Sequence, residues 1–287
     1  MTDVKACEIC LGRLQTRLFS KRGYDIVRCD ACGHIWLPLA ETDETLHRAY
    51  EQFFTDGAYL DYVADRRAAA RNFARFIGVL RRFQPNGRLF EVGSAYGFFL
   101  DLARSHWQVE GIDISPAATA YARSELGLDV ACGEFLEHPV EVAAYDAIVM
   151  WDTIEHLRAP RAYLQKIATM LKPGGILALT TGDVGRLMPR LRGPRWRLYD
   201  PPFHLQYFTR GTLARLLRHF AFDVVQVQST GYFRSVGFML HRLLMYGKPP
   251  GWRRLYRAAE WTGLTDRIIY LNVFDIMMVV ARKQGDR

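Results

Sequence analysis

The chain has 287 residues, a net charge of +8 and 49% apolar residues. That length suits one large domain with a small appendage, and the apolar content is ordinary for a globular protein with a substantial core. No apolar stretch follows the first charges and no run of about 18 apolar residues occurs, so neither a secretion signal nor a membrane span is expected. We therefore expect a cytoplasmic protein, whose positive charge permits an anionic partner.

Two Cys-x2-Cys pairs stand at the start of the chain, formed by Cys7, Cys10, Cys29 and Cys32. This spacing is typical of a tetrahedral Zn²⁺ site. Cytoplasmic thiols stay reduced, which favours zinc over disulfides. Short strand candidates lie between the pairs, so residues 1–40 are predicted to form a zinc ribbon that needs its metal to fold.

Residues 41–84 are predicted to form a helical linker. Apolar residues recur there at helical spacing among arginines, from about 58 to 83, and an Asn86-Gly87 turn follows.

From residue 85 onward, apolar strands alternate with helices. The strand candidates are 88–92, 108–112, 129–132, 145–150, 176–181, 222–229 and 272–282, and the helix candidates are 97–105, 115–126, 158–171 and 209–219. Ser115 before Pro116 is a helix start signal, and Thr209 is a candidate cap. Cys132 ends a strand and is expected to be a core residue rather than a nucleophile. The alternation predicts an α/β fold with a mostly parallel sheet covered on both faces.

Two segments interrupt the alternation and are expected to act as lid insertions. Residues 183–208 are rich in proline and hold five arginines between 186 and 197, which predicts either a solvated loop or a clamp for an anionic group. Residues 231–270 are amphipathic and rich in aromatic and basic side chains. They either pack as a lid or rest on an anionic membrane surface.

A glycine turn, Glu91-Val-Gly-Ser-Ala-Tyr-Gly97, joins the first strand of this alternation to a helix, and Asp113 ends the next strand. An acid in that place can hold the two hydroxyls of a ribose. The chain lacks a P-loop, and Ala95 stands where the dinucleotide fingerprint has a glycine, which is tolerable if its φ is negative. The pattern therefore favours an adenosyl ligand without a pyrophosphate.

These segments resemble those of class I S-adenosylmethionine-dependent methyltransferases. The matching stretches are Glu91–Gly97, Gly111-Ile-Asp113, Tyr145–Asp152 and Leu171-Lys-Pro-Gly-Gly175. The resemblance implies a Rossmann-like, seven-stranded sheet with one antiparallel strand over residues 85–287. The ribbon at the front is similar to that of small-molecule, quinone and sugar methyltransferases.

The resemblance also implies a set of cofactor contacts. Glu91, Gly93 and Gly97 would shape the methionine pocket, and Asp113 would hold the ribose. Glu134 and Phe135 would flank the adenine, and Trp151 and Asp152 would line the methyl-donor channel. Ala95, Tyr96 and Ile114 complete the predicted cofactor-binding residues.

Transfer of the methyl group to oxygen or carbon needs a base. Glu155 and His156 follow the fourth strand, in a segment similar to that of quinone O-methyltransferases, where they could form a small metal site with Asp152. Alternatively they only bond the next helix and position the cofactor loop. His204, before the fourth helix, is either a second candidate base or a structural hydrogen-bonding residue.

Taken together, the sequence predicts transfer of a methyl group to a small-molecule acceptor, with O-methylation favoured. Two alternatives stay open: an RNA methyltransferase whose ribbon and arginines grip the backbone, and a non-catalytic module that senses the cofactor and recruits a partner. Motifs for methylation of adenine or cytosine in nucleic acids are absent, so a nucleic acid partner is not expected.

Overall fold

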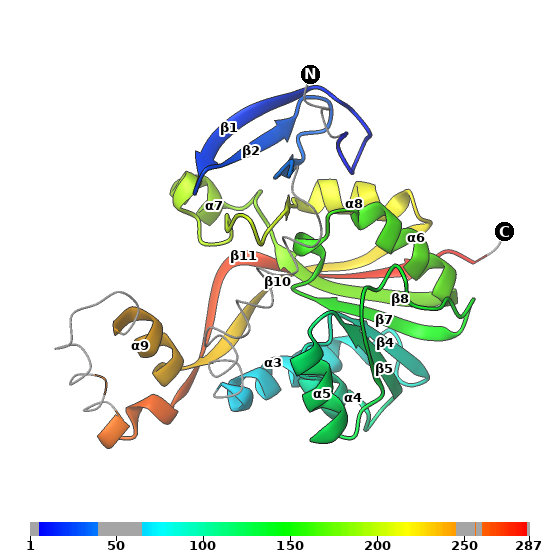
Figure 1. The fold of residues 1–287 in the computed structure, drawn as a ribbon, viewed down its shortest axis with the longest axis vertical. Coiled ribbons are helices and arrows are strands. Elements are labelled where there is room, and N and C mark those ends of the chain that lie inside the picture. The colour runs from blue at the N-terminus through cyan, green and yellow to red at the C-terminus, as the bar shows by residue number, and fades with distance from the viewer. Residues whose placement is uncertain (1–5, 40–64, 245–255, 257–259, 286–287) are drawn as a thin grey trace.

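The computed structural model describes residues 6–39, 65–244, 256 and 260–285. Within them the chain forms a seven-stranded sheet and a four-stranded sheet (Figure 1). Residues 40–64, which include the first part of the predicted linker, lie outside the described residues.

The seven-stranded sheet has the order β10-β11-β8-β7-β4-β5-β6. Its strands are β4 (Arg88–Val92), β5 (Gln108–Asp113), β6 (Val130–Cys132), β7 (Tyr145–Trp151), β8 (Leu171–Gly182), β10 (Phe222–Ser235) and β11 (Ile268–Lys283). Strands β4 to β8 are parallel to one another, whereas β11 is antiparallel to both β8 and β10. This arrangement confirms the predicted Rossmann-like fold.

Helices cover both faces of this sheet (Figure 1). On one face lie α3 (Arg66–Leu80), α4 (Phe98–Ala103) and α5 (Pro116–Ser124), and on the other lie α6 (Pro160–Met170) and α8 (Arg210–Arg218). Both predicted caps are confirmed. The Ser115 hydroxyl accepts from the amide of Ala118, and Thr209 forms a reciprocal capping box with Thr212. Central strands buried on both faces explain their nearly continuous apolar sequence.

The ribbon continues into the α/β domain. Its strands β1 (Gln15–Lys21), β2 (Tyr24–Cys29) and β3 (Ile35–Trp36) form the smaller sheet with β9 (Gln206–Tyr207), which comes from the far side of the sequence. Trp36 of the ribbon and Phe208 after β9 belong to one buried apolar cluster. The two predicted modules therefore share a core.

The first predicted insertion, 183–208, contains α7 (Leu187–Arg192), a 3₁₀ turn η3 (Gly193–Arg195) and β9. One of its arginines, Arg197, donates to Oδ1 of the buried Asp275 at 2.8 Å, and the indole of Trp196 donates to Oδ2 at 2.8 Å. Arg197 therefore anchors the insertion to β11.

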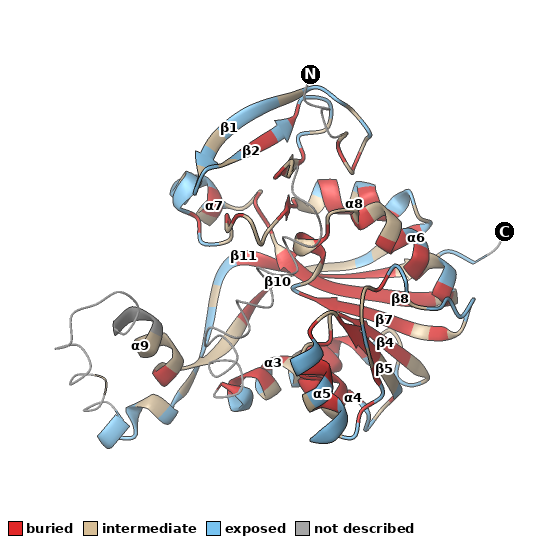
Figure 2. Ribbon diagram, in the orientation of Figure 1, coloured by how far each residue is buried: buried red, intermediate tan, exposed pale blue. Residues whose placement is uncertain are grey.

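The second predicted insertion, 231–270, differs from the expectation at both ends. Strand β10 runs on to Ser235 and β11 already begins at Ile268, so the two strands pair in an arm that leaves the body of the protein (Figures 1 and 2). The helix α9 (Val236–Leu244) follows β10, and the 3₁₀ turn η4 (Leu264–Asp266) precedes β11. The strands are longer than expected because their ladder continues past the bulge between Thr230 and Tyr232. Residues 245–255 and 257–259 lie outside the described residues.

The prediction that Cys132 lies in the core is wrong, because its side chain is exposed. Cys132 is the last residue of β6, and β6 is an edge strand of the sheet. Among the described helices, none has both the length and the apolar character that crossing a bilayer requires.

Candidate active site

The glycine turn lies between β4 and α4, at the carboxyl ends of the parallel strands. Gly93 and Gly97 have φ values of +77° and +74°, a region that favours glycine. A Cβ on Gly93 would lie 2.7 Å from Oγ1 of Thr153, and one on Gly97 would lie 2.5 Å from Cδ1 of Leu128. Both positions therefore require glycine for conformation and for space.

Ala95, at the centre of this turn, has φ +45°, so the negative φ under which an alanine would be tolerable is not found. A left-handed alanine costs roughly 1–2 kcal/mol relative to the right-handed region. Its amide donates to Oδ2 of Asp113 at 2.8 Å, and this bond helps to hold the strained turn. Such strain is found most often at ligand sites.

Asp113 ties the turn to the end of β5. Besides Ala95, it accepts a hydrogen bond at Oδ1 from the amide of Ser115 at 2.9 Å. Burial raises the pKa of Asp113, and hydrogen bonds from the amides of Ser115, Ala95 and Ile114 oppose that rise. Each carboxylate oxygen has a second lone pair, so the same side chain can hold the turn and accept from a ligand's hydroxyls.

Two buried oxygens beside the turn have no hydrogen-bond partner among the described residues. They are Oε2 of Glu91 and Oγ of Ser94, on side chains that are 3% and 5% exposed. Burial, and secondly the neighbouring Asp113 carboxylate, raise the pKa of Glu91 well above its usual value. Buried polar atoms are normally bonded, and those that are not call for a ligand or water. The ammonium and carboxylate groups of a methionine moiety would supply the missing hydrogen-bond partners of these two oxygens. The residues present therefore fit the cofactor that the sequence predicts.

The two residues predicted to flank the adenine differ in their surroundings. Glu134 accepts a side-chain hydrogen bond, whereas Phe135 lies in the core. The Tyr163 hydroxyl donates to Oε1 of Glu134. The Phe135 ring is buried and packs on Phe90 and Tyr163, at centroid distances of 6.1 and 5.3 Å. The ring of the predicted Tyr96 is likewise buried.

Trp151 is the last residue of β7, and Asp152 follows it directly. Trp151 packs on Phe76 at 4.8 Å, and its buried Nε1 has no hydrogen-bond partner. Asp152 has φ +49°; its Oδ1 accepts from the Thr180 hydroxyl at 2.8 Å and its Oδ2 from the Tyr232 hydroxyl at 2.5 Å. Tyr232 lies in β10, and no sequence motif had indicated that it contacts the site.

Two loops that are far apart in sequence pair beside this point. The 3₁₀ turn η2 (Ile154–His156) follows β7, and the amide of Leu205 donates to the carbonyl of Glu155 at 2.7 Å. The imidazoles of His156 and His204 meet edge to face, with centroids 4.7 Å apart. The predicted catalytic residues Glu155, His156 and His204 therefore form one cluster.

Each imidazole in the cluster is oriented by a backbone carbonyl. Nδ1 of His156 donates to Phe203 O at 2.9 Å, and Nδ1 of His204 donates to Leu198 O at 2.8 Å. Burial, and then His204, lower the pKa of His156 to about 3, and burial lowers the pKa of His204. Burial, and then Asp152, raise the pKa of Glu155 to about 8.

The predicted metal trio Asp152, Glu155 and His156 differs from the one that the structure brings together. One ligand atom from each of Glu155, His156 and His204 lies within 4.8 Å of the others. Asp152 instead bonds Thr180 and Tyr232, because its left-handed backbone turns the carboxylate toward β8 and β10.

The four cysteines of the ribbon also meet. Sγ of Cys7 lies 3.5 Å from that of Cys32, and Sγ of Cys10 lies 3.5 Å from that of Cys29. Zinc at about 2.3 Å from each of four tetrahedral sulfurs separates them by about 3.8 Å. The four thiols therefore fit a zinc ion with little movement.

A buried bridge connects the ribbon with the η2 loop. Nε2 of His34 donates to Oε1 of Gln206 at 2.9 Å, and Nε2 of Gln206 donates to the carbonyl of Leu157 at 3.1 Å. Gln206 lies in β9, which pairs with β3 of the ribbon. The sequence did not single out Gln206, since a glutamine in a short strand carries no motif.

Comparison with known proteins gives the same assignment as this geometry. A family model described as methyltransferase domain matches residues 59–227. The chain is 32% identical over 120 residues to a ubiquinone biosynthesis O-methyltransferase of Xanthomonas axonopodis, covering 39% of this chain and 50% of that protein. It is 25% identical over 194 residues to the Parvibaculum lavamentivorans protein of the same description, covering 66% and 71%. The chain thus spans about half the length of the first curated relatives that it matches.

A solved structure agrees over nearly the whole chain. The 1,6-didemethyltoxoflavin-N1-methyltransferase of Burkholderia thailandensis, described with bound S-adenosylhomocysteine, has a TM-score of 0.56 and 18% identity, covering 94% of this chain and 99% of that one. At this identity the likeness shows the fold alone. The family model spans more than half of the chain and agrees with the sheet order and the glycine turn, so the protein belongs to the S-adenosylmethionine-dependent methyltransferase family.

Proposed function

We propose that this protein transfers a methyl group from S-adenosylmethionine to an oxygen of a small-molecule acceptor. The observation that carries the proposal is the pair of buried, unpartnered oxygens of Glu91 and Ser94 beside the strained turn. The names of the relatives support O-methylation, since several are ubiquinone biosynthesis O-methyltransferases.

Bound S-adenosylmethionine would supply an electrophilic methyl group on a sulfonium, so the protein's part is positioning and proton removal. Asp113 would accept from the ribose hydroxyls while it holds the amide of Ala95. Glu91 would accept from the ammonium group at Oε2. The acceptor's hydroxyl proton would leave toward the cluster of Glu155, His156 and His204, which lies beside Asp152 at the end of β7.

The cofactor site is tested by calorimetric titration with S-adenosylmethionine and S-adenosylhomocysteine. D113A should weaken binding at least about 100-fold, because hydrogen bonds to a charged group are worth about 1.5–3 kcal/mol each. E110Q is a matched control, a carboxylate on the same strand at its opposite end, and should change affinity less than about twofold. Unchanged affinity in folded D113A would contradict the assignment of the cofactor site. The acceptor class is tested separately, by measuring methyl transfer to a panel of phenols.

We also propose a structural zinc ion at Cys7, Cys10, Cys29 and Cys32. The support is the close approach of the four sulfurs and the shared core of ribbon and α/β domain. Purified protein should contain zinc, and a strong chelator should lower the unfolding temperature. Because Trp36 packs in the common core, its fluorescence should report the change. The site would be refuted if the purified protein contained no zinc and the chelator left its unfolding temperature unchanged.

Contact with a membrane surface through 231–270 stays a prediction. Exposed apolar side chains in the described part of this segment, such as Trp261 and Ile269, support testing it by co-sedimentation with acidic liposomes.

A further inference from the structure

The ribbon holds the η2 loop beside the cofactor turn through two buried side chains. The amide of Cys29 donates to the carbonyl of His34 at 2.8 Å, which ties His34 to the second cysteine pair. The fully buried His34 side chain bonds Gln206, which is 3% exposed and bonds the carbonyl of Leu157 at the end of η2. We propose that His34 and Gln206 are positioning residues through which the ribbon and its zinc ion set the affinity for S-adenosylmethionine.

The direction of both hydrogen bonds in this bridge is fixed. The carbonyl of Leu157 can only accept, so the amide nitrogen of Gln206 faces it at 3.1 Å and Oε1 faces the ribbon. Oε1 also can only accept, so Nε2 of His34 carries the proton, at 2.9 Å. A side chain without polar atoms at position 206 therefore leaves a buried N–H and a buried carbonyl without these bonds.

A second connection runs through the backbone of Leu205, the neighbour of Gln206. The carbonyl of Leu205 accepts from the amide of Leu37, directly after β3, at 2.8 Å. Its amide donates to the carbonyl of Glu155 within η2 at 2.7 Å. The ribbon therefore reaches η2 at two points, Glu155 by backbone and Leu157 by side chains.

Thr153 connects η2 with the cofactor turn. It directly precedes η2, and its hydroxyl donates to the carbonyl of Val92 at the end of β4, at 3.4 Å. A Cβ on Gly93 would lie 2.7 Å from the same hydroxyl, so Thr153 lies against the turn. Protein interiors are close-packed and transmit displacements. A shift of η2 therefore moves the support of Gly93 and lowers cofactor affinity, although neither His34 nor Gln206 touches the cofactor.

The zinc ion makes this positioning conditional. A module of about 40 residues depends on its metal to fold. Without zinc, the cysteine pair that holds the carbonyl of His34 is released, and the imidazole no longer faces Gln206. Control by zinc rests on the proposed zinc ion, whereas positioning by the two side chains does not.

The positioning is tested by titrating full-length, zinc-loaded protein with S-adenosylhomocysteine in a calorimeter. Q206M keeps the length of the side chain and removes both hydrogen bonds, so affinity should fall about tenfold. H34L should cause the same loss. H34Q restores an N–H donor at a similar reach and should stay within about threefold of the wild type.

The matched control is I9V, which trims the buried core of the ribbon and leaves the bridge intact. It should lower the unfolding temperature without changing cofactor affinity. Every variant should hold about one zinc ion per chain, which shows that its ribbon is folded.

Control by zinc is tested by adding a chelator. Removal of zinc should lower the affinity of the wild type for S-adenosylhomocysteine about tenfold, and that of Q206M less than about threefold, because coupled changes are not additive. Coupling between two ligands is reciprocal. Saturating S-adenosylhomocysteine should therefore tighten zinc binding in the wild type by the same factor, and not in Q206M.

Unchanged affinity in zinc-loaded Q206M, or equal losses in H34L and H34Q, would overturn the positioning. Unchanged affinity in folded, chelated wild type would overturn the control by zinc. If chelation unfolds the wild type, as circular dichroism would show, the zinc-loaded variants decide. D113A tests the cofactor site separately, so a loss of affinity in D113A with none in Q206M refutes this inference alone.

Discussion

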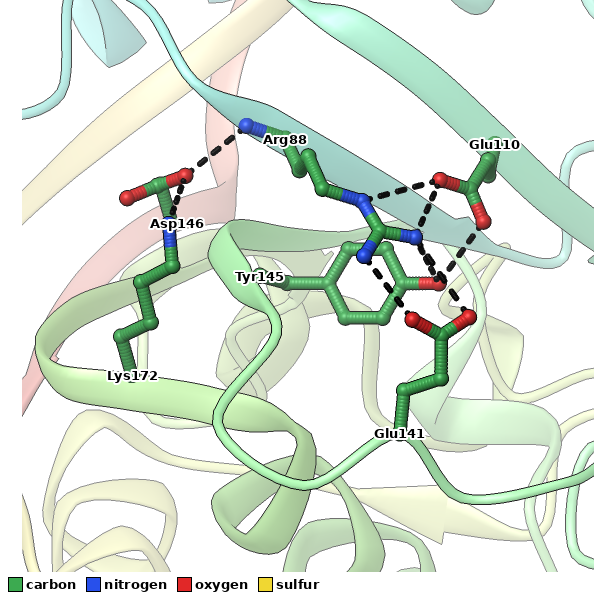
Figure 3. A network of polar contacts seen from close by, with 6 residues as sticks. All are labelled: Arg88, Glu110, Glu141, Tyr145, Asp146 and Lys172. Carbon is green, nitrogen blue, oxygen red and sulfur yellow. Dashed lines mark hydrogen bonds and ion pairs between the residues drawn. The ribbon is translucent and has the colours of Figure 1, made fainter.

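The polar groups at the two ends of the central strands differ in whether their hydrogen bonds and ion pairs are made. At the amino ends, Arg88 bonds Glu110 at 2.7 Å and Glu141 at 2.8 Å, and the Tyr145 hydroxyl donates to Glu110 at 2.8 Å (Figure 3). Beside them Asp146 accepts from Lys172 at 2.8 Å. Every group in this network has a partner.

At the carboxyl ends of the same strands, several buried polar atoms have no partner within the part of the chain that the structure describes. They are Oε2 of Glu91, Oγ of Ser94, Nε1 of Trp151 and Oε2 of Glu155. Arg88 and Glu91 are three residues apart on β4, so the contrast lies within single strands. Polar groups at one end stabilise the fold, whereas those at the other end are held ready for a ligand, which is where ligands of open parallel sheets bind.

Shape alone would have chosen the wrong end. A hollow of about 630 Å³ lies at the amino ends, lined by Gly87, Arg88, His106, Asp146 and Lys172 among others. The charged groups Arg88, Asp146 and Lys172 that line it are bonded to one another or to their neighbours. One buried polar atom of the hollow, Nε1 of Trp107, also lacks a partner among the described residues, but these charged groups do not. Buried carboxyl oxygens without partners at the carboxyl ends therefore mark the site better than the hollow does.

The largest effect is expected from G93A, which distorts the carboxyl end. An alanine there must keep φ near +77° and place Cβ 2.7 Å from Oγ1 of Thr153. The left-handed backbone alone costs roughly 1–2 kcal/mol. We expect affinity for S-adenosylmethionine to fall at least about 100-fold, measured by calorimetry, with a lower unfolding temperature.

The matched control for this change is G78A. Nothing lies within 4 Å of a Cβ on Gly78, which is in the last turn of α3. This alanine should raise stability by up to about 1 kcal/mol and leave cofactor affinity unchanged. If G93A bound the cofactor as G78A does, the turn would not be part of the site.

The amino end is broken by R88M, which keeps the aliphatic stem and removes the guanidinium. Glu110 and Glu141 then lose their common partner, and we expect a loss of about 2 kcal/mol in the free energy of unfolding. Affinity for the cofactor should change less than about twofold. Urea unfolding and calorimetry on the same variant test both statements, and a larger loss of affinity than of stability would reverse the comparison.

The sequence predicted the fold and the cofactor turn because both rest on local patterns. The alternation of strands and helices, the Ser115 cap and the placement of Asp113 after β5 need no knowledge of distant residues. Ala95 is the exception within the turn. Its backbone follows from the bond to Asp113, which forms only when β5 lies beside β4.

The cluster of Glu155, His156 and His204 could be predicted only in part. The three residues were candidates, but the segments that bring them together are about fifty positions apart and pair through the bond from Leu205 to Glu155. No local pattern indicates that these two segments pair, so the predicted metal site combined Glu155 and His156 with the adjacent Asp152. The same limit hid Gln206 and Tyr232, which come from distant strands.

E91Q separates the two uses of polar groups at one residue. Burial and the Asp113 carboxylate raise the pKa of Glu91, so above its unfolded pKa of about 4.3 the folded protein holds more protons than the unfolded chain. Stability should therefore fall as pH rises from about 5, with a slope of up to about 1.4 kcal/mol per pH unit from this group.

E91Q should reduce that slope in thermal unfolding between about pH 5 and 8, while affinity for the cofactor falls about tenfold. E137Q, at an exposed glutamate, is the control and should leave both unchanged. An identical pH dependence in E91Q and wild type would show that Glu91 does not hold its proton in the folded state.

The smallest effect is expected from K172M at the amino end. The Lys172 side chain is 43% exposed, and Asp146 keeps the amide of Arg88 as a donor at 2.9 Å when the lysine is removed. Exposed ion pairs are worth about 0–1 kcal/mol and weaken with salt, so stability should change by less than about 0.5 kcal/mol. Cofactor affinity should not change. A cost above about 1 kcal/mol that disappears in R88M would show that the two ion pairs act as one network, because only coupled groups lose their effect together.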